Sequence, residues 1–199
     1  GFFPASLHHS SAILEDMRLS KDEHELRLIE TASTAINEAL RAIVPLVRIG
    51  SSERQIREVI NYSIRMFGAR PAFDTMVLTG PSAVEIHPAP RNRVLKKDEL
   101  VLIDCGAEHE MYSCDITRML PVSGVFTALQ RTLYQTVLDA QFIAMSSIKE
   151  GVTLESVHRN TTYRLIEGLI EVKVLKGSVK KLYDTKAYRP YFPHGVSHT

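Results

Sequence analysis

The sequence predicts an α+β fold in which helices, a β-hairpin and further helices follow one another along the chain. Three observations support this prediction. Two N-terminal stretches, from Ser20 to about Pro45 and from Ser52 to Gly68, place apolar residues at helical spacing. Residues 100–118 form two strand-like runs joined by a short polar turn. Two more helical stretches then follow, at 127–149 and 153–174.

The composition narrows the classes of protein to consider. The chain has 199 residues, of which 44% are hydrophobic, enough for one ordinary domain or two small ones. Its net charge is +1 with interspersed charges, so we expect no nucleic-acid or membrane partner. No segment reaches the roughly 20 apolar residues of a membrane span. The start, Gly1–Ala5, lacks the features of a signal peptide. We therefore expect a cytoplasmic protein, and because residue 1 is not Met, a chain that starts inside a longer polypeptide.

Capping signals define the first two helices. Ser20 followed by Glu23 has the capping-box pattern of a helix start, and Pro45 marks the end. The second helix begins at Ser52 and stops at Gly68. Both helices carry an apolar stripe that predicts core packing: Leu26, Ile29, Ala32, Ala35, Ile36, Ala39, Leu40 and Ile43 in the first, and Ile56, Val59, Ile60, Ile64 and Phe67 in the second.

The remaining elements follow in order. Residues 71–100 predict short strands and loops, with Met76–Leu78 as the best strand. After the hairpin, 127–149 predicts a helix, and a second helix begins at the N-cap Thr153. Lys176–Pro190 predicts a polar connection.

Two aspartates in the hairpin are the first candidate functional residues. The apolar run Leu100–Ile103 predicts a buried strand, and Asp104 ends it, so we expect Asp104 to be partly buried. Folding the hairpin about His109 and Glu110 places Asp104 opposite Asp115. Directly opposed carboxylates repel one another unless a cation binds between them, so the pair predicts a metal site. The alternative is two solvated turn residues. The register also stays open, because His-Glu is not a favoured two-residue turn.

Two cysteines flank these aspartates. Cys105 and Cys114 are near neighbours in the same hairpin, and two cysteines do not make a disulfide framework. A disulfide between them is one interpretation. A reduced cytosolic protein is the simpler one.

Histidines supply the second group of candidates. His194 and His198 are four apart, and Pro193 and Gly195 disfavour a helix between them. In an extended segment they share a face, which suits a metal ligand beside a proton-handling group. The alternative is a pair of histidines at a chain end. His87 lies in a proline-stiffened loop and carries no signal alone.

Several of these segments together resemble one family. The sequences at 102–106, 112–118, 121–127 and 193–198 resemble the metal-binding core of the pita-bread metallopeptidases, most closely aminopeptidase P and prolidase. The lead-in at 16–26 resembles the helix that opens their catalytic domain. The resemblance extends over roughly residues 14 to 199.

The resemblance implies a fold and a domain organisation. It implies the N-terminal part of a pita-bread fold, an antiparallel sheet with helices packed on one face. Residues 1–15 would be a linker from an N-terminal domain, and 16–199 a partial catalytic domain lacking its C-terminal portion. The family's two further glutamate ligands have no counterpart before Thr199. Glu108 and Glu110 are expected in the turn and are not nominated as substitutes.

The resemblance also implies residue roles. Asp104 would bind one metal ion, Asp115 would bridge two, and His198 would bind the second. His87 would contact the substrate, and His194 would stabilise the tetrahedral intermediate. The implied cofactor is a pair of divalent ions, usually Mn²⁺ in this branch. The implied reaction is hydrolysis of the bond between an N-terminal residue and a following proline.

The resemblance leaves alternatives open. The enzyme could be an Xaa-Pro dipeptidase or a methionine aminopeptidase relative. It could also be a non-catalytic pita-bread protein that binds peptides or proteins, or a natural half-domain with a binding role. We expect the parent to be a homo-oligomer, and this chain alone to be inactive because its site is incomplete.

Overall fold

The computed structural model describes residues 11–85, 89 and 91–196. They divide into two compact units, Gly1–Val125 and Phe126–Thr199, and each unit is described by itself. Among the described residues, no helix combines the length and apolarity needed to cross a membrane.

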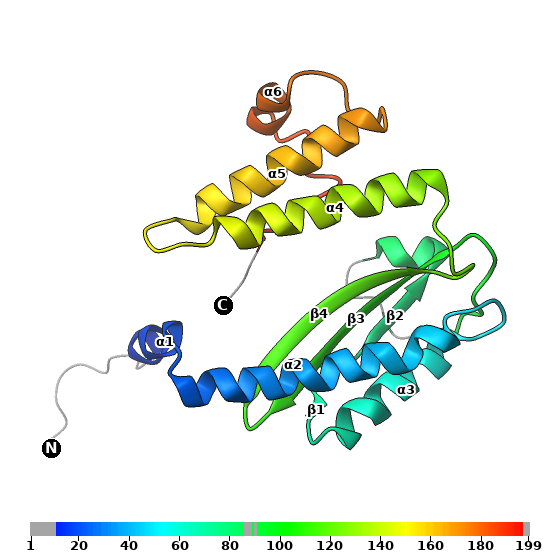
Figure 1. Cartoon of the computed structure of the whole chain (residues 1–199). Coiled ribbons are helices and arrows are strands. Elements are labelled where there is room, and N and C mark those ends of the chain that lie inside the picture. Colours follow the sequence, from blue (N-terminus) through cyan, green and yellow to red (C-terminus); the bar gives the residue numbers. More distant parts are fainter. Residues whose placement is uncertain (1–10, 86–88, 90, 197–199) are drawn as a thin grey trace, which may run out of the picture. The chain divides into compact units, whose positions relative to one another are not determined.

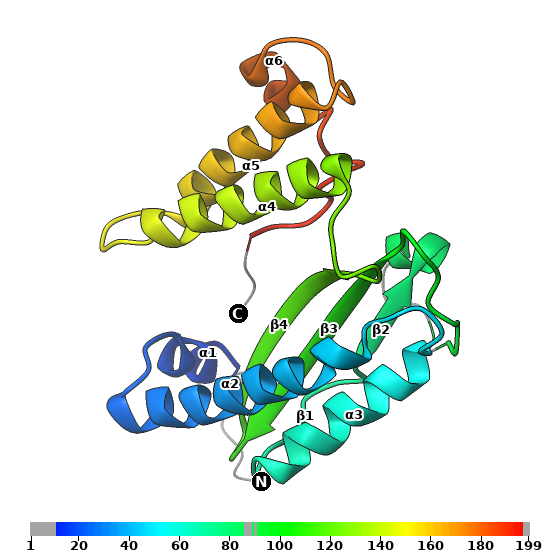
Figure 2. The same cartoon turned by 45° about the vertical axis from the view of Figure 1, so that its right-hand side comes forward.

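The first unit is built on a four-stranded antiparallel sheet. Strand β3 (Leu100–His109) pairs with β4 (Tyr112–Pro121) along one edge. The short strands β1 (Arg70–Pro71) and β2 (Met76–Thr79) pair with successive parts of β3. Helices α2 and α3 cover one face of this sheet (Figures 1 and 2). The predicted α+β class, with helices on one face of an antiparallel sheet, is confirmed.

The helices of this unit start at local capping signals. Helix α2 (Glu23–Ile43) begins after Asp22, whose side chain accepts a hydrogen bond from the Glu25 amide while Glu25 accepts one from Asp22. The predicted cap at Ser20 and Glu23 is therefore wrong by two residues, because the downstream Asp and Glu satisfy the same pattern. The short helix α1 (Ser11–Leu19) precedes it.

Helix α3 (Glu53–Met66) matches its prediction. Ser52 is the N-cap, and Gly68 follows the helix with a φ of 76°, the left-handed conformation of a glycine stop. Short 3-10 turns lie at Val44–Leu46 and Gly80–Val84.

The core of the first unit lies between the sheet and these two helices. Alternate residues of β3 point into it, and all are fully buried: Val101, Ile103, Cys105 and Ala107. The buried residues of α2 and α3 include Ala32, Ala35, Ile36, Ala39, Ile43, Ile56, Ile60 and Ile64. Most of both predicted helical stripes thus belongs to the core, but Leu26 and Phe67 were wrongly included, because each is 49% exposed. Asp104 lies on the opposite face of β3, which points away from these two helices.

The second unit is helical. Helices α4 (Ala128–Ser147) and α5 (Leu154–Glu171) pack together after their N-caps Thr127 and Thr153, close to the predicted bounds. Helix α6 (Val179–Asp184) lies where the sequence predicted a polar connection. That prediction is wrong because Leu182 and the nearby Tyr188 are buried against Ile166, although their neighbours are charged.

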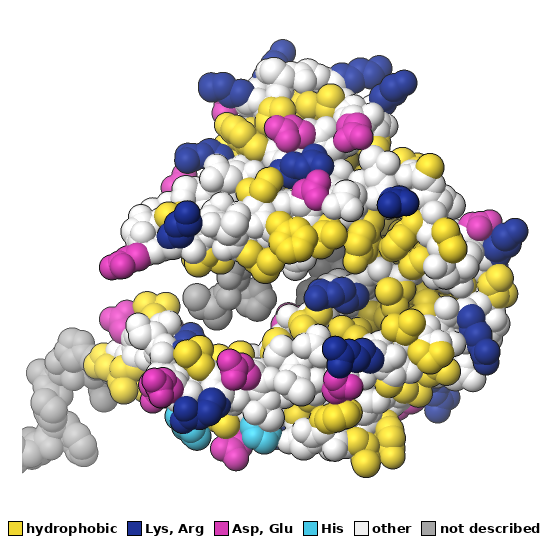
Figure 3. All heavy atoms as spheres, viewed as in Figure 1, with side chains coloured by type: hydrophobic (Ala, Val, Ile, Leu, Met, Phe, Trp, Pro, Cys, Tyr) yellow, Lys and Arg dark blue, Asp and Glu magenta, His cyan; other side chains and the backbone are white. Residues whose placement is uncertain are grey.

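Helix α4 also presents apolar side chains to its surface. Leu129, Val137 and Phe142 are each more than half exposed, and apolar side chains gather over this helix in Figure 3. A contiguous exposed apolar surface commonly contacts further protein.

Candidate metal centre

The hairpin that carries the two aspartates turns later than predicted. His109 pairs with Tyr112, and the two residues between them, Glu110 and Met111, both have positive φ, at 48° and 72°. Two positive φ values are the signature of a tight type I′ hairpin turn. The turn therefore moves one residue along, and every cross-strand pairing shifts by two.

The predicted opposition of the aspartates is consequently wrong. Asp104 lies opposite Thr117, and Asp115 lies opposite Gly106. A shift of two positions keeps each side chain on the same face of the sheet. Asp104 and Asp115 are therefore diagonal neighbours on one face, at positions about 7–8 Å apart, somewhat less at Cβ.

The surroundings of the two carboxylates differ. Asp104 is partly buried, as predicted, and its Oδ1 accepts a hydrogen bond of 2.8 Å from the Thr117 hydroxyl. This contact holds the Asp104 carboxylate in one orientation on the sheet face. Asp115 is exposed. Together they present hard oxygen donors of the kind that Mg²⁺, Ca²⁺ and Mn²⁺ prefer.

An aromatic ring that sequence reasoning missed lies on the same face. A Cβ placed on Gly106 would lie 2.4 Å from Cε1 of Phe73, so the ring occupies the space that a side chain would take. Because Gly106 is the cross-strand partner of Asp115, the ring packs beside the carboxylate pair. The signal in the sequence is a glycine inside a strand, which often marks a close approach.

The described residues supply part of a metal site. They contain no group of three or more His, Cys, Asp or Glu side chains placed to hold an ion. Asp104 and Asp115 fit a divalent cation by donor type and shared face, and the predicted third ligand, His198, lies outside the described residues. The pair therefore fits as two members of a larger ligand set.

The structure places one of the two predicted catalytic histidines. His194 is exposed in the second unit, where its ring meets Phe192 edge-on at 5.4 Å between centroids. Phe192 in turn stacks on His158 at 5.5 Å. His87 lies outside the described residues, and so does the shared face predicted for His194 and His198.

Glu108 does not lie in the turn as predicted. It is a residue of β3 opposite Ser113, and its carboxylate accepts two hydrogen bonds from the Arg70 guanidinium, at 2.6 and 3.0 Å. This ion pair joins β3 to β1. Glu110 is in the turn, as predicted.

Both cysteines of the hairpin are free thiols. The disulfide interpretation is therefore not supported. Burial raises the pKa of the Cys105 thiol to about 12, and the nearby Asp104 and Asp115 carboxylates act in the same direction. Cys114 is only partly buried.

This difference predicts unequal thiol reactivity. With a pKa of about 12, only about one part in ten thousand of Cys105 is thiolate at pH 8. We expect an aromatic disulfide reagent to modify Cys114 first in the native chain, and Cys105 only after unfolding. Peptide mapping of the modified thiols checks this order. Equal labelling of both sites in the native state would contradict the burial of Cys105.

Comparison with known proteins gives consistent matches. Residues 27–199 match the model of metallopeptidase family M24. The chain is 31% identical over 196 residues to the Xaa-Pro aminopeptidase of Escherichia coli, covering 98% of this chain and 44% of that protein. It is 33% identical over 187 residues to the Xaa-Pro aminopeptidase of Haemophilus influenzae, covering 94% of this chain and 44% of that protein.

Solved structures agree with these matches. Proline aminopeptidase P II from Yersinia pestis superposes with a TM-score of 0.94 at 34% identity, over 98% of this chain and 45% of that one. Pseudomonas aeruginosa aminopeptidase PepP gives a TM-score of 0.91 at 30% identity, over 94% of this chain and 43% of that one. The chain thus spans less than half the length of these relatives.

Proposed function

Because the chain belongs to the metallopeptidase family M24, we propose that it is part of a proline-specific aminopeptidase. Its substrates would be peptides with proline at the second position, and its reaction the release of the residue before that proline. The names of the relatives support this choice of substrate. The observation that carries the proposal is the pair Asp104 and Asp115 on one face of one hairpin.

The proposed roles follow from chemistry and position. Asp104 and Asp115, with His198, would hold two divalent cations, and we propose Mn²⁺ because carboxylate oxygens suit it. Bound ions of this kind polarise a scissile carbonyl and lower the pKa of water. Thr117 would keep the Asp104 carboxylate oriented through its 2.8 Å hydrogen bond. His87 would contact the substrate, and His194 would stabilise the tetrahedral intermediate.

We further propose that residues 16–199 are one part of a larger catalytic domain and that 1–15 are a linker. The chain covers 44% of the Escherichia coli relative, and α4 exposes large apolar side chains that suit contact with more protein. Two aspartates and one histidine would bind metal weakly, so we propose that this chain is inactive alone. A cytoplasmic location and a homo-oligomeric parent belong to the same proposal.

The first test measures manganese-dependent release of the N-terminal residue from an Xaa-Pro-Xaa tripeptide. It compares this chain with a C-terminally extended form and includes an Xaa-Pro dipeptide and a Met-Ala-Xaa tripeptide. We expect cleavage of the Xaa-Pro-Xaa peptide by the extended form alone. Preference for the dipeptide would favour an Xaa-Pro dipeptidase, and preference for Met-Ala-Xaa a methionine aminopeptidase. Inactivity of both forms towards all three would favour a non-catalytic binding protein.

A further inference from the structure

Two histidines of the second unit contact one phenylalanine. The Phe192 ring stacks on the ring of His158 from α5, with 5.5 Å between the centroids and 21° between the planes. It also meets the His194 ring edge-on, at 5.4 Å and 71°. Stacked and edge-on arrangements at such separations are favourable for aromatic rings. The three rings therefore form one continuous cluster that extends from α5 to His194.

Phe192 is fixed by the core of the second unit. Its side chain is partly buried and packs against the cluster of Ile166, Leu182 and Tyr188. Its backbone amide donates a hydrogen bond of 3.0 Å to the Tyr188 carbonyl oxygen. Tyr188 is only 6% exposed, and its ring stacks on Tyr183 of α6 at 5.7 Å between centroids. The Phe192 ring thus has a defined place in this unit.

His158 supports the Phe192 ring by packing. Its Nδ1 is buried and has no hydrogen-bond partner among the described residues, and its Nε2 lies 3.5 Å from the Thr162 hydroxyl oxygen. That hydroxyl donates to the His158 carbonyl oxygen at 2.7 Å, so towards the ring it can only accept. A buried nitrogen without a partner costs free energy. The contact with Phe192 therefore depends on the flat ring of His158 and not on a hydrogen bond from it.

The backbone around His194 fixes its side chain poorly. Pro193 has no N–H to donate, and Gly195 has no Cβ to restrict the chain. Within the part of the chain that the structure describes, Phe192 is the last residue whose backbone amide donates to another backbone group. Nδ1 of His194 lies 3.2 Å from the carbonyl oxygen of the adjacent Gly195, a contact within the same loop. The Phe192 ring therefore joins the His194 imidazole to the folded core.

A hollow of about 260 Å³ opens beside these rings. Its lining includes His158, Phe192 and His194, together with Arg189. His194 is exposed, so its imidazole is supported by Phe192 and can also be reached from solvent. A group that acts on a substrate needs both properties, because the support fixes its direction and the opening lets the substrate meet it.

We propose that Phe192 is a positioning residue for His194, and that the His158 ring supports Phe192 in this role. This inference rests on the proposed peptidase function, in which His194 stabilises the tetrahedral intermediate. Phe192 and His158 act through the His194 imidazole and bind no metal ion. Their effect is on the rate of the chemical step, because that rate depends on the direction of the imidazole.

The first experiment needs no activity. It measures the order parameter of the His194 ring in this chain by NMR relaxation of the ring carbons, with the signal assigned from the spectrum of His194→Gln. We expect Phe192→Leu to lower this order parameter below about 0.6, the range of flexible groups, because leucine removes the ring contact. Phe142→Leu makes the same change at an exposed position of α4 and should leave it unchanged.

Two substitutions of His158 separate ring packing from the chemistry of its imidazole. His158→Phe keeps a flat ring beside Phe192 and removes the nitrogen without a partner, so the order parameter of His194 should be retained. His158→Ala removes the ring and should lower the order parameter, though less than Phe192→Leu does. If Phe192→Leu fails to fold by circular dichroism, His158→Ala decides the test.

The second experiment measures kcat and KM on an Xaa-Pro-Xaa tripeptide in the C-terminally extended form. We expect Phe192→Leu to lower kcat by roughly ten- to a hundredfold, as misplacement of a catalytic group does. KM and manganese content should be unchanged. Phe192→Tyr keeps the ring and should retain kcat. His194→Ala should lower kcat as well, and adding Phe192→Leu to it should lower kcat no further.

The outcomes separate the claims. An unchanged order parameter of His194 in both Phe192→Leu and His158→Ala would overturn the positioning, whatever the function. Equal losses of kcat from Phe192→Leu with and without the His194 imidazole would show an effect that does not act through His194, and would overturn the role in catalysis. An inactive extended form would overturn the catalytic part together with the proposed function, while the relaxation experiment would still decide the positioning.

Discussion

Replacing Asp115 with Asn is expected to abolish peptide hydrolysis in the C-terminally extended form and to lower its metal content by about one ion per chain. The substitution preserves the size of the side chain but removes its negative charge. In the proposed site Asp115 would bridge two ions, so both would lose a ligand. Because Asp115 is exposed on β4, the change should leave the fold intact.

Metal content by plasma mass spectrometry and Mn²⁺ affinity by electron paramagnetic resonance check this expectation. The matched control is Asp184→Asn, which removes a carboxylate paired with Lys180 on the exposed surface of α6. It should change neither activity nor metal content. Metal content equal to that of the unmodified protein in Asp115→Asn would contradict the bridging role.

Replacing Gly168 with Ala is expected to destabilise the second unit by about 1–3 kcal/mol, as overpacking does. Gly168 is buried on α5, and a Cβ there would lie 2.1 Å from Cγ2 and 2.8 Å from Cβ of Thr136 on α4. The two helices must move apart to accept it. In an open helix the same change would stabilise by about 1 kcal/mol, so the sign of the effect reports the close approach.

Urea unfolding followed by circular dichroism measures this change. Adding Thr136→Ala to Gly168→Ala removes the two nearest atoms, Cγ2 and Oγ1, and should recover part of the loss. A Gly168→Ala chain more stable than the original would show that α4 and α5 do not approach as closely as the structure indicates.

Local sequence signals predicted much of this fold because they report nearest-neighbour physics. Ser52, Thr127 and Thr153 cap helices where the sequence placed them, since each cap depends on a hydrogen bond within one turn. The cap of α2 was misplaced because Ser20 and Asp22 compete for the same role, and the pattern alone does not rank them. Helix α6 was missed because its burial depends on Ile166, which lies on a different helix.

The candidate site, like the fold, was predicted in part from the sequence. Strand alternation determined from sequence alone that Asp104 and Asp115 share a face, because a register error of two residues preserves the face. The cross-strand partners of the two aspartates depended on the turn at Glu110 and Met111. The sequence did not reveal this turn, because no glycine or asparagine marks its positive φ values.

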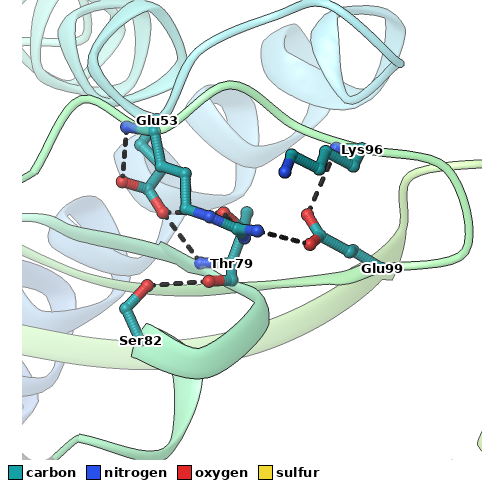
Figure 4. Close-up of polar contacts among 6 residues, drawn as sticks. Glu53, Thr79, Ser82, Lys96 and Glu99 are labelled. Atoms are coloured by element: carbon teal, nitrogen blue, oxygen red, sulfur yellow. Dashed lines mark hydrogen bonds and ion pairs between the residues drawn. The ribbon is translucent and has the colours of Figure 1, made fainter.

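What the sequence by itself determined about this protein is the class of fold, the starts of α3, α4 and α5, and the two carboxylates of the candidate site. These follow from periodicity and from contacts within a few residues. Only the tertiary structure decided the register of the hairpin, the ring of Phe73 over Gly106 and the hydrogen bonds of the buried Glu53 carboxylate (Figure 4). In sequence Glu53 is an ordinary acidic residue in a first helical turn. Its carboxylate meets donors 26 and 40 residues away, and contacts at that separation exist only once the chain has folded.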